Sequence, residues 1–183
     1  MNFQTMRTFF ALLAILANIA TIGLVVVGIS GRSKDTSPFE FLRGATMWLA
    51  GIVALTATLG SLYLSDIVHL IPCKFCWYQR VAMYPIALIA LLGAWKKDGG
   101  ARLYITALAV IGSGIALWHR ALQQWPSLDS GACAAVGPPC SAPYIKEFGF
   151  ITIPYMALSA FLLILALTWA GYVNSKTTTT RTD

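Results

Sequence analysis

The chain has 183 residues, of which 57% are hydrophobic and only 11% charged, and its mean hydropathy is +0.70. Soluble proteins carry charge on about a quarter of their residues, so this composition excludes an ordinary soluble domain and indicates a membrane protein. The net charge of +6 comes from short basic runs between apolar segments, which argues against nucleic-acid binding and is typical of membrane topology signals.

Five apolar stretches approach the roughly 20 residues that a helix needs to cross the hydrocarbon core of a bilayer. They cover residues 9–29, 45–64, 81–95, 103–117 and 150–173. We therefore predict an all-α integral membrane protein with five spans and no separate soluble domain. The connections between the spans are 31–44, 65–80, 96–102 and 119–149. The last ten residues, 174–183, are polar and repetitive, which predicts a disordered tail.

The first stretch could instead be a signal peptide, because Arg7 precedes it. Its apolar run of about 21 residues exceeds the 7–15 of a signal-peptide core, and no small-residue cleavage site follows it before residue 31. We therefore expect it to be retained as a transmembrane helix.

The basic residues predict the orientation, because cytoplasmic loops carry the excess of Lys and Arg. If the connections alternate between the two sides, eight basic residues fall on the side of 96–102 and five on the other. The connection 96–102, KKDGGAR, is the clearest cytoplasmic marker, with three basic residues in seven. This orientation places the N-terminus outside, the C-terminus in the cytoplasm and all four cysteines on the outer face, where disulfides persist.

The connection 65–80 ends in PCKFCWYQR, which contains the Cys-x-x-Cys pair Cys73 and Cys76. Such a pair commonly has one thiol of lowered pKa, which favours disulfide exchange over a permanent cross-link. We expect the next helix to begin near Trp77, with Cys76 at its positive N-terminal end and Arg80 one turn further on the same face. Taken alone, Arg80 could be an anchor at the membrane surface, but beside this pair a functional charge is favoured.

Cys133 and Cys140 form a second pair in the Gly- and Pro-rich sequence ACAAVGPPCSAPY. The loop alone leaves open whether this pair is a structural cross-link or a second exchanging disulfide. A four-cysteine zinc site is disfavoured, because six residues separate this pair where zinc sites commonly have two to four. We expect no metal.

An exchanging disulfide must pass its two electrons to an acceptor. The chain has no flavin or nucleotide fingerprint and no CxxCH haem motif, so the expected acceptor is a quinone dissolved in the bilayer. Cys76 would react with the quinone ring, and Arg80 would stabilise the negative charge that develops on the ring oxygen.

PCKFCWYQR, the order of the four cysteines and the segment YIKEFGFITIPYMAL together resemble the DsbB/BdbC family of disulfide bond formation proteins, and most closely the BdbC type of Gram-positive bacteria. The resemblance covers residues 45–173. It implies a four-helix bundle in the bacterial cytoplasmic membrane that reoxidises an extracytoplasmic thioredoxin-fold thiol oxidase, with menaquinone or ubiquinone as the electron acceptor. Residues 1–44 would then add one extra transmembrane helix and a cytoplasmic linker, and 174–183 a cytoplasmic tail.

The resemblance also implies roles for individual residues. Cys73 and Cys76 would be the quinone-proximal pair, with the thiolate on Cys76. Cys133 and Cys140 would meet the partner, with Cys133 favoured as the site of the mixed disulfide. Two further positions match residues near the quinone in the family: Arg80, and His119 in the sequence LWHRALQQWP. The alternative for His119 is a polar residue at the membrane surface.

Two features depart from the family pattern: the loop between Cys133 and Cys140 is shorter than in the best-known Gram-negative members, and the first helix is additional. Other functions fit less well. A vitamin K epoxide reductase-like enzyme has its two cysteine pairs in the reverse order, and a conduit for outward electron transfer needs cysteines on the inner side. A structural membrane subunit with disulfide-bonded loops remains the alternative from a different class.

Overall fold

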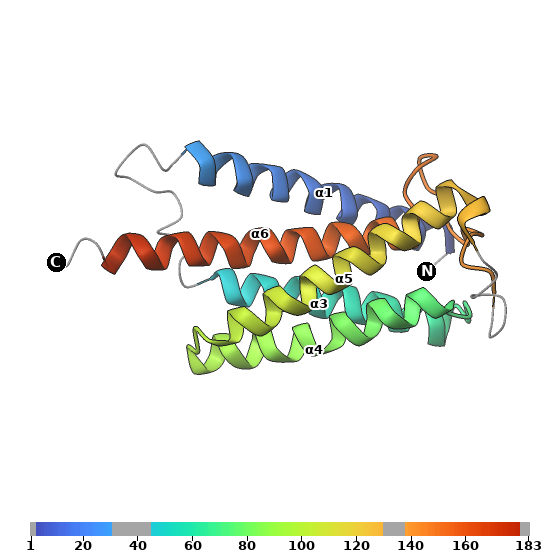
Figure 1. Cartoon of the computed structure of the whole chain (residues 1–183). Coiled ribbons are helices and arrows are strands. Elements are labelled where there is room, and N and C mark those ends of the chain that lie inside the picture. Colours follow the sequence, from blue (N-terminus) through green and yellow to red (C-terminus); the bar gives the residue numbers. More distant parts are fainter. Residues whose placement is uncertain (1–2, 31–44, 130–137, 180–183) are drawn as a thin grey trace.

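The computed structural model describes residues 3–30, 45–129 and 138–179 (Figure 1). Its helices are α1 (Phe3–Ser30), α3 (Thr46–Leu62), the π-helical turn η2 (Tyr63–Ile67), α4 (Lys74–Lys96), α5 (Ala101–Gln124), the 3-10 turn η3 (Pro126–Leu128) and α6 (Ile153–Thr179). The described residues contain no β-strand, only an isolated bridge between Glu147 and Ile151. The predicted all-α fold is confirmed.

Five of these helices are long and apolar enough to cross a membrane, as the sequence predicts. Two of the differences concern polar residues: α4 begins at Lys74, ahead of the apolar run that starts at residue 81, and α5 continues beyond residue 117 to Gln124. We ended the predicted spans at polar residues, but Arg80 and His119 are buried inside the bundle and do not face lipid. A polar side chain satisfied inside a bundle does not end a span.

The C-terminal segment also differs from the prediction. We expected residues 174–183 to be disordered, but α6 continues to Thr179. Adding a residue to an existing helix costs far less than starting a helix, so a long apolar helix extends readily into a polar segment. Residues 180–183 and the expected linker 31–44 lie outside the described residues.

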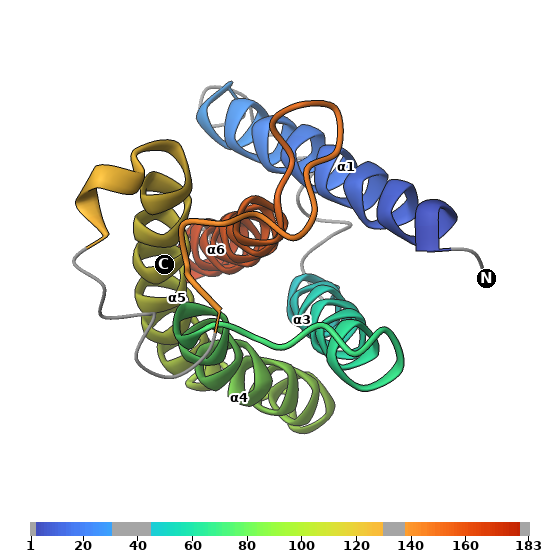
Figure 2. The same cartoon turned by 90° about the vertical axis from the view of Figure 1, so that its right-hand side faces the viewer.

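Four helices, α3 to α6, form a bundle, and α1 packs on the outer side of α6 (Figure 2). In the view down the bundle, α6 is surrounded by α1, α3 and α5, while α4 lies between α3 and α5. Small buried residues such as Ala54, Ala90 and Ala109 allow these helices to approach closely. In a bilayer no hydrophobic effect drives helices together, because the lipid is as apolar as their side chains. Helices associate there largely through close packing of small residues.

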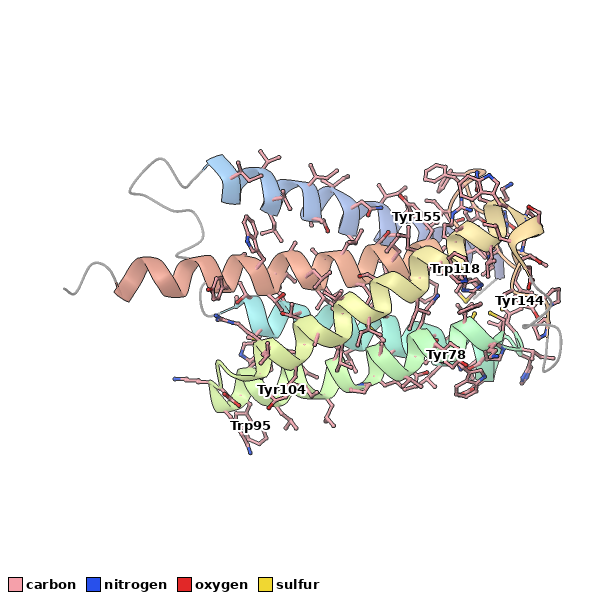
Figure 3. All side chains as sticks on the ribbon, in the orientation of Figure 1. Tyr78, Trp95, Tyr104, Trp118, Tyr144 and Tyr155 are labelled. Carbon is pink, nitrogen blue, oxygen red and sulfur yellow. The ribbon has the colours of Figure 1, made fainter. Side chains whose placement is uncertain are left out.

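The outer surface carries large apolar side chains, as expected for contact with lipid. Exposed aromatic residues gather near both ends: Trp95 and Tyr104 lie at one end, and Tyr78, Trp118 and Tyr144 lie toward the other (Figure 3). Trp and Tyr are enriched at the two membrane interfaces, where the ring contacts lipid and its polar atom contacts water. The bundle therefore has the surface of a multi-pass membrane protein.

Both described cysteine-bearing segments lie at one end of the bundle. The connection before α4, which ends at Cys73, and the segment from residue 138 to α6, which contains Cys140, are both beside the N-terminal end of α1 (Figure 1). The short connection between α4 and α5 and the C-terminal end of α6 lie at the opposite end. The fold thus brings residues from distant parts of the sequence to one end.

Gly112 lets α5 and α6 pack closely, because a Cβ at this position would overlap the ring of Phe161. We expect Gly112→Ala to lower the thermal unfolding midpoint in detergent, since overpacking a core costs about 1–3 kcal/mol. Gly114→Ala in the same helix is the control, because nothing lies within 4 Å of its Cβ position. Alanine there favours the helix by about 1 kcal/mol and should not lower the midpoint. Equal shifts for the two variants, measured by circular dichroism, would contradict this packing.

Candidate active site

Cys73 is the N-cap residue of α4. Its backbone is extended (φ −72°, ψ 170°), and its Sγ accepts a hydrogen bond of 3.4 Å from the backbone N–H of Cys76. A side-chain acceptor at this position satisfies one of the N–H groups that a helix start leaves unpaired. We expected α4 to begin near Trp77, which was wrong: because Cys73 caps the helix three residues earlier, Cys76 lies inside its first turn.

The Cys73 sulfur is surrounded by hydrogen-bond donors. Cys73 and Cys76 are free thiols with their Sγ atoms 2.8 Å apart, and His119 Nε2 lies 3.6 Å from Cys73 Sγ. The hydrogen bond from the Cys76 thiol, helped by the one from His119, lowers the pKa of Cys73 to about 4, although burial acts in the opposite direction. The resemblance implies a thiolate on Cys76, and this role stays a prediction; the hydrogen bonds of the reduced pair favour the thiolate on Cys73.

His119 is held in position by Gln79. Its imidazole is 2% exposed on α5, and Gln79 Nε2 lies 3.2 Å from its Nδ1. An amide nitrogen is only a donor, so Nδ1 accepts and the ring proton of a neutral His119 is on Nε2, which faces Cys73. The ring of Phe75 packs against the imidazole with 5.7 Å between ring centroids. His119 therefore presents a hydrogen-bond donor to the sulfur of Cys73.

Cys140 is buried and disulfide-bonded. Its Sγ, the Sγ of Cys73 and a ring nitrogen of His119 all lie within 4.8 Å of one another. Three such atoms resemble part of a metal site, but a disulfide sulfur lacks the thiolate charge that a metal ligand needs. The same arrangement places a thiolate next to a disulfide, as thiol–disulfide exchange requires. Cys133 lies outside the described residues, so its assignment stays a prediction.

Arg80 is a buried charge that binds α3. Its Nε donates to Ser61 Oγ and its Nη2 donates to the Ser61 carbonyl, both over 2.8 Å, and its guanidinium carbon lies 5.1 Å from the ring centroid of Trp77. The π-helical turn that begins at Tyr63 departs from the α-helical pattern just after Ser61. In the described part of the chain Arg80 has no carboxylate partner. A guanidinium has five N–H groups, so some remain for a ligand.

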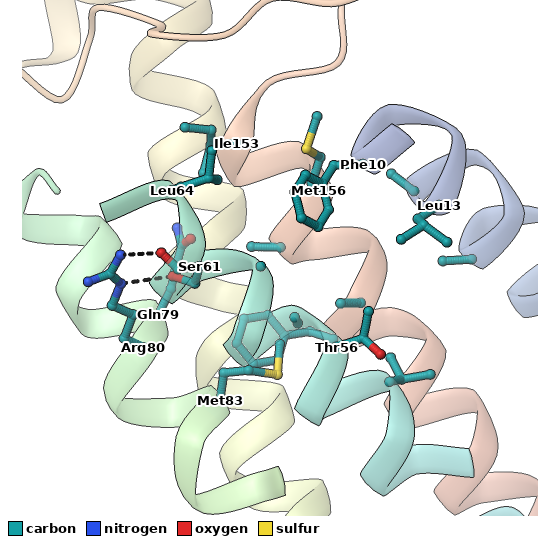
Figure 4. Close-up of a pocket in the computed structure, with 18 of the residues that line it drawn as sticks. Phe10, Leu13, Thr56, Ser61, Leu64, Gln79, Arg80, Met83, Ile153 and Met156 are labelled. Atoms are coloured by element: carbon teal, nitrogen blue, oxygen red, sulfur yellow. Dashed lines mark hydrogen bonds between the residues drawn. The ribbon is translucent and has the colours of Figure 1, made fainter. Parts of the chain in front are cut away.

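A cavity of about 430 Å³ brings Cys76 and Arg80 together. Arg80, Gln79 and Ser61 lie on the α3 and α4 side of this cavity, opposite Phe10 of α1 (Figure 4). The other lining residues are mostly apolar and come from α1, α3, α4 and α6. Pockets for small molecules commonly have 300–1,000 Å³ and a few polar groups in an apolar wall.

The polar groups of the cavity fit a molecule with an oxygen-bearing head and an apolar body. Arg80 is the one charged residue among the described residues that line it, and it has N–H groups free for an oxygen. The hydroxyl of Tyr84, one helical turn beyond Arg80, is buried without a hydrogen-bond partner. His119 is not part of the cavity wall, because it lies on the Cys73 side of α4.

Sequence reasoning missed Gln79 and Ser61. The sequence around Gln79 did indicate a possible site residue, because Gln79 is a polar residue next to Arg80 in a segment that forms a membrane helix. The sequence around Ser61 gave no such indication, because Ser61 precedes Arg80 by 19 positions and is an ordinary residue for a transmembrane helix.

Comparison with known proteins gives consistent matches over the part of the chain that holds these residues. The family model "Disulfide bond formation protein DsbB" matches residues 43–171. Disulfide bond formation protein C of Bacillus subtilis is 44% identical over 119 residues, which are 65% of this chain and 86% of that protein.

Two further relatives have similar names. Probable disulfide formation protein C of Halalkalibacterium halodurans is 45% identical over 113 residues, 62% of this chain and 82% of that protein. A probable disulfide formation protein of Coxiella burnetii is 35% identical over 127 residues, 69% of this chain and 86% of that protein. No solved structure matches significantly. The match to the family model includes every site residue named above except those of α1.

Cys76→Ala should raise the pKa of Cys73 from about 4 toward its ordinary value near 9, because it removes the largest cause of the lowered pKa. The rate at which iodoacetamide alkylates Cys73, followed by mass spectrometry against pH, reports this pKa. In the parent protein alkylation should persist until the pH falls to about 4, whereas in the variant it should be lost several pH units higher.

The control is Lys74→Ala, an exposed residue in the same helical turn, which should leave the profile unchanged. An unchanged profile for Cys76→Ala would show that Cys76 does not stabilise the Cys73 thiolate.

Proposed function

Because the chain belongs to the DsbB family of disulfide bond formation proteins, a family of membrane oxidoreductases, we propose that it is a quinone-dependent protein disulfide oxidoreductase. It reoxidises an extracytoplasmic thioredoxin-fold thiol oxidase and passes the electrons to a membrane quinone, in support of disulfide formation in exported proteins. The observation that carries this proposal is the position of the Cys73–Cys76 pair between the Cys140 disulfide and the cavity that contains Arg80.

The first step is an exchange with the partner. A thiolate of the reduced partner attacks the disulfide between Cys133 and Cys140, and the partner leaves oxidised while the two loop cysteines become thiols. The Cys140 thiolate then attacks Cys73 in the Cys73–Cys76 disulfide, and Cys76 leaves with the electron pair. Attack by Cys133 on the resulting Cys73–Cys140 bond restores the loop disulfide. Free Cys73 and Cys76 beside a disulfide-bonded Cys140 are what this sequence leaves behind.

The second step returns the Cys73–Cys76 pair to its disulfide, which releases two electrons and the one proton of the Cys76 thiol, since Cys73 is already a thiolate. Reduction of a quinone to a quinol takes up two protons, so the second proton comes from water. A quinone bound in the cavity supplies the two-electron acceptor. Cys76 is the member of the pair that lines the cavity, and the free N–H groups of Arg80 are placed to bind an oxygen there. A fixed positive charge in a water-poor site stabilises developing negative charge more strongly than the same charge in water.

The orientation follows from the distribution of charge. The connection 96–102, with Lys96, Lys97 and Arg102, is at the end of the bundle opposite the cysteines. The positive-inside rule then supports a cytoplasmic position for this end and an extracytoplasmic position for the cysteines and the start of α1. The partner is accordingly an extracytoplasmic protein.

The alternative is a structural membrane subunit with cross-linked loops. Such a role needs closed disulfides and uses no cavity, whereas Cys73 and Cys76 are free thiols and Cys76 lies at the wall of a cavity. Reduction of a quinone by the purified protein, given a reduced thioredoxin-fold oxidase, separates the two functions. Under the proposal Cys76→Ser abolishes quinone reduction, and an unchanged rate in this variant would favour the structural role.

Arg80→Ala should slow quinone reduction about 10²- to 10³-fold, the usual cost of removing one preorganised charge stabiliser. Exchange between Cys140 and the Cys73–Cys76 pair, trapped by alkylation in the absence of quinone, should persist and shows that the variant is folded. The matched control is Arg120→Ala on α5, whose guanidinium binds Gln124 and lies outside the cavity wall. If Arg80→Ala reduced quinone at the rate of the parent protein, Arg80 would have no role in the reaction.

A further inference from the structure

The additional helix α1 is fixed on the bundle by two specific polar contacts. Arg7 Nη2 lies 2.6 Å from Glu147 Oε1, and Asn18 Nδ2 donates a hydrogen bond of 3.0 Å to the hydroxyl of Tyr155 on α6. Glu147 is presented by a tight turn in which it exchanges two backbone hydrogen bonds of 2.9 Å with Ile151. These contacts set the register of α1 on α6.

In this register α1 forms part of the cavity wall. Phe10 reaches across to α3, where a Cβ on Gly60 would lie only 2.6 Å from Phe10 Cε1. Gly60 immediately precedes Ser61, the residue that binds Arg80. Phe10 therefore forms the α1 wall of the cavity near its polar groups (Figure 4).

Beyond Phe10 the cavity continues between α1 and α3 toward the lipid. Ala17 and Leu16 of α1 and Ile52 of α3 belong to its wall. Leu16 is 61% exposed and Ile52 is 52% exposed, so this part of the wall reaches the outer surface of the bundle. The space thus has a polar end at Arg80 and an apolar mouth that opens into the bilayer between α1 and α3.

We propose that the groove between α1 and α3 binds the polyprenyl tail of the quinone, and that α1 is a wall of this tail site. The inference rests on the proposed function, which places the quinone ring at Cys76 and Arg80. A quinone matches this cavity in polarity: the carbonyl oxygens of its ring suit the polar end at Arg80, and its long apolar tail suits the mouth between α1 and α3. The match to the family model, 43–171, does not include α1, so this wall lies outside the family core.

The test fills the groove without touching the thiols. Ala17→Phe in the full-length protein should raise the apparent KM for a quinone with a polyprenyl tail about tenfold, which corresponds to about 1.4 kcal/mol of lost binding. The KM for a tailless quinone should stay at the parental value. The matched control is Ile19→Phe on the same helix, because Ile19 is 61% exposed and outside the cavity wall. This control should leave both KM values unchanged.

Equal changes for the two quinones, or equal behaviour of Ala17→Phe and Ile19→Phe, would overturn the tail site while leaving quinone reduction itself intact. If the parental protein reduced neither quinone, the proposed function would fail and the tail site with it.

A second measurement uses the unmodified protein and does not depend on how a variant folds. A quinone with a diazirine on its tail should label α1 near Ala17 upon illumination, and excess quinone with an unmodified tail should prevent this labelling. Labelling that avoids α1, or labelling that excess quinone does not displace, would overturn the tail site.

Discussion

The site depends on the start of a single helix. Because the sulfur of Cys73 caps α4, Cys73 stands at the boundary of the helix and Cys76 lies one turn further in. Cys73 then meets His119 and the Cys140 disulfide, while Cys76 meets the cavity with Arg80. If the helix began at Trp77, as the sequence suggested, both sulfurs would lie in the connection and this separation of their surroundings would be lost.

Gln79, Arg80 and His119 are polar side chains buried in the bundle, and each binds a partner from another helix. Gln79 on α4 binds His119 on α5, and Arg80 on α4 binds Ser61 on α3. Each pair joins two helices at the level of the thiols, so the contacts that satisfy these groups also fix the site. The charge of Arg80 has no counter-charge among the described residues, and this cost is expected where a charge serves a ligand or a reaction.

Local patterns were enough to predict much of this protein. Composition and apolar runs predicted five spans, and the stretch from Cys73 to Arg80 indicated both a reactive pair and a functional charge. The errors concern contacts between distant segments. The partner of Arg80, the location of His119 on the Cys73 side and the docking of α1 through Arg7 and Glu147 all depend on how the helices pack, which no local pattern records. Helix ends were misplaced for the same reason, since buried polar residues appear as loop residues in the sequence.

The central claim is that Cys73 is the junction through which electrons pass from Cys140 to Cys76. A variant with Cys76 and Cys133 both replaced by serine retains only Cys73 and Cys140 as cysteines. Peptide mapping of this variant by mass spectrometry after mild oxidation tests the junction directly. We predict that nearly all molecules of the variant carry a disulfide between Cys73 and Cys140. Two free thiols under the same conditions would contradict this claim.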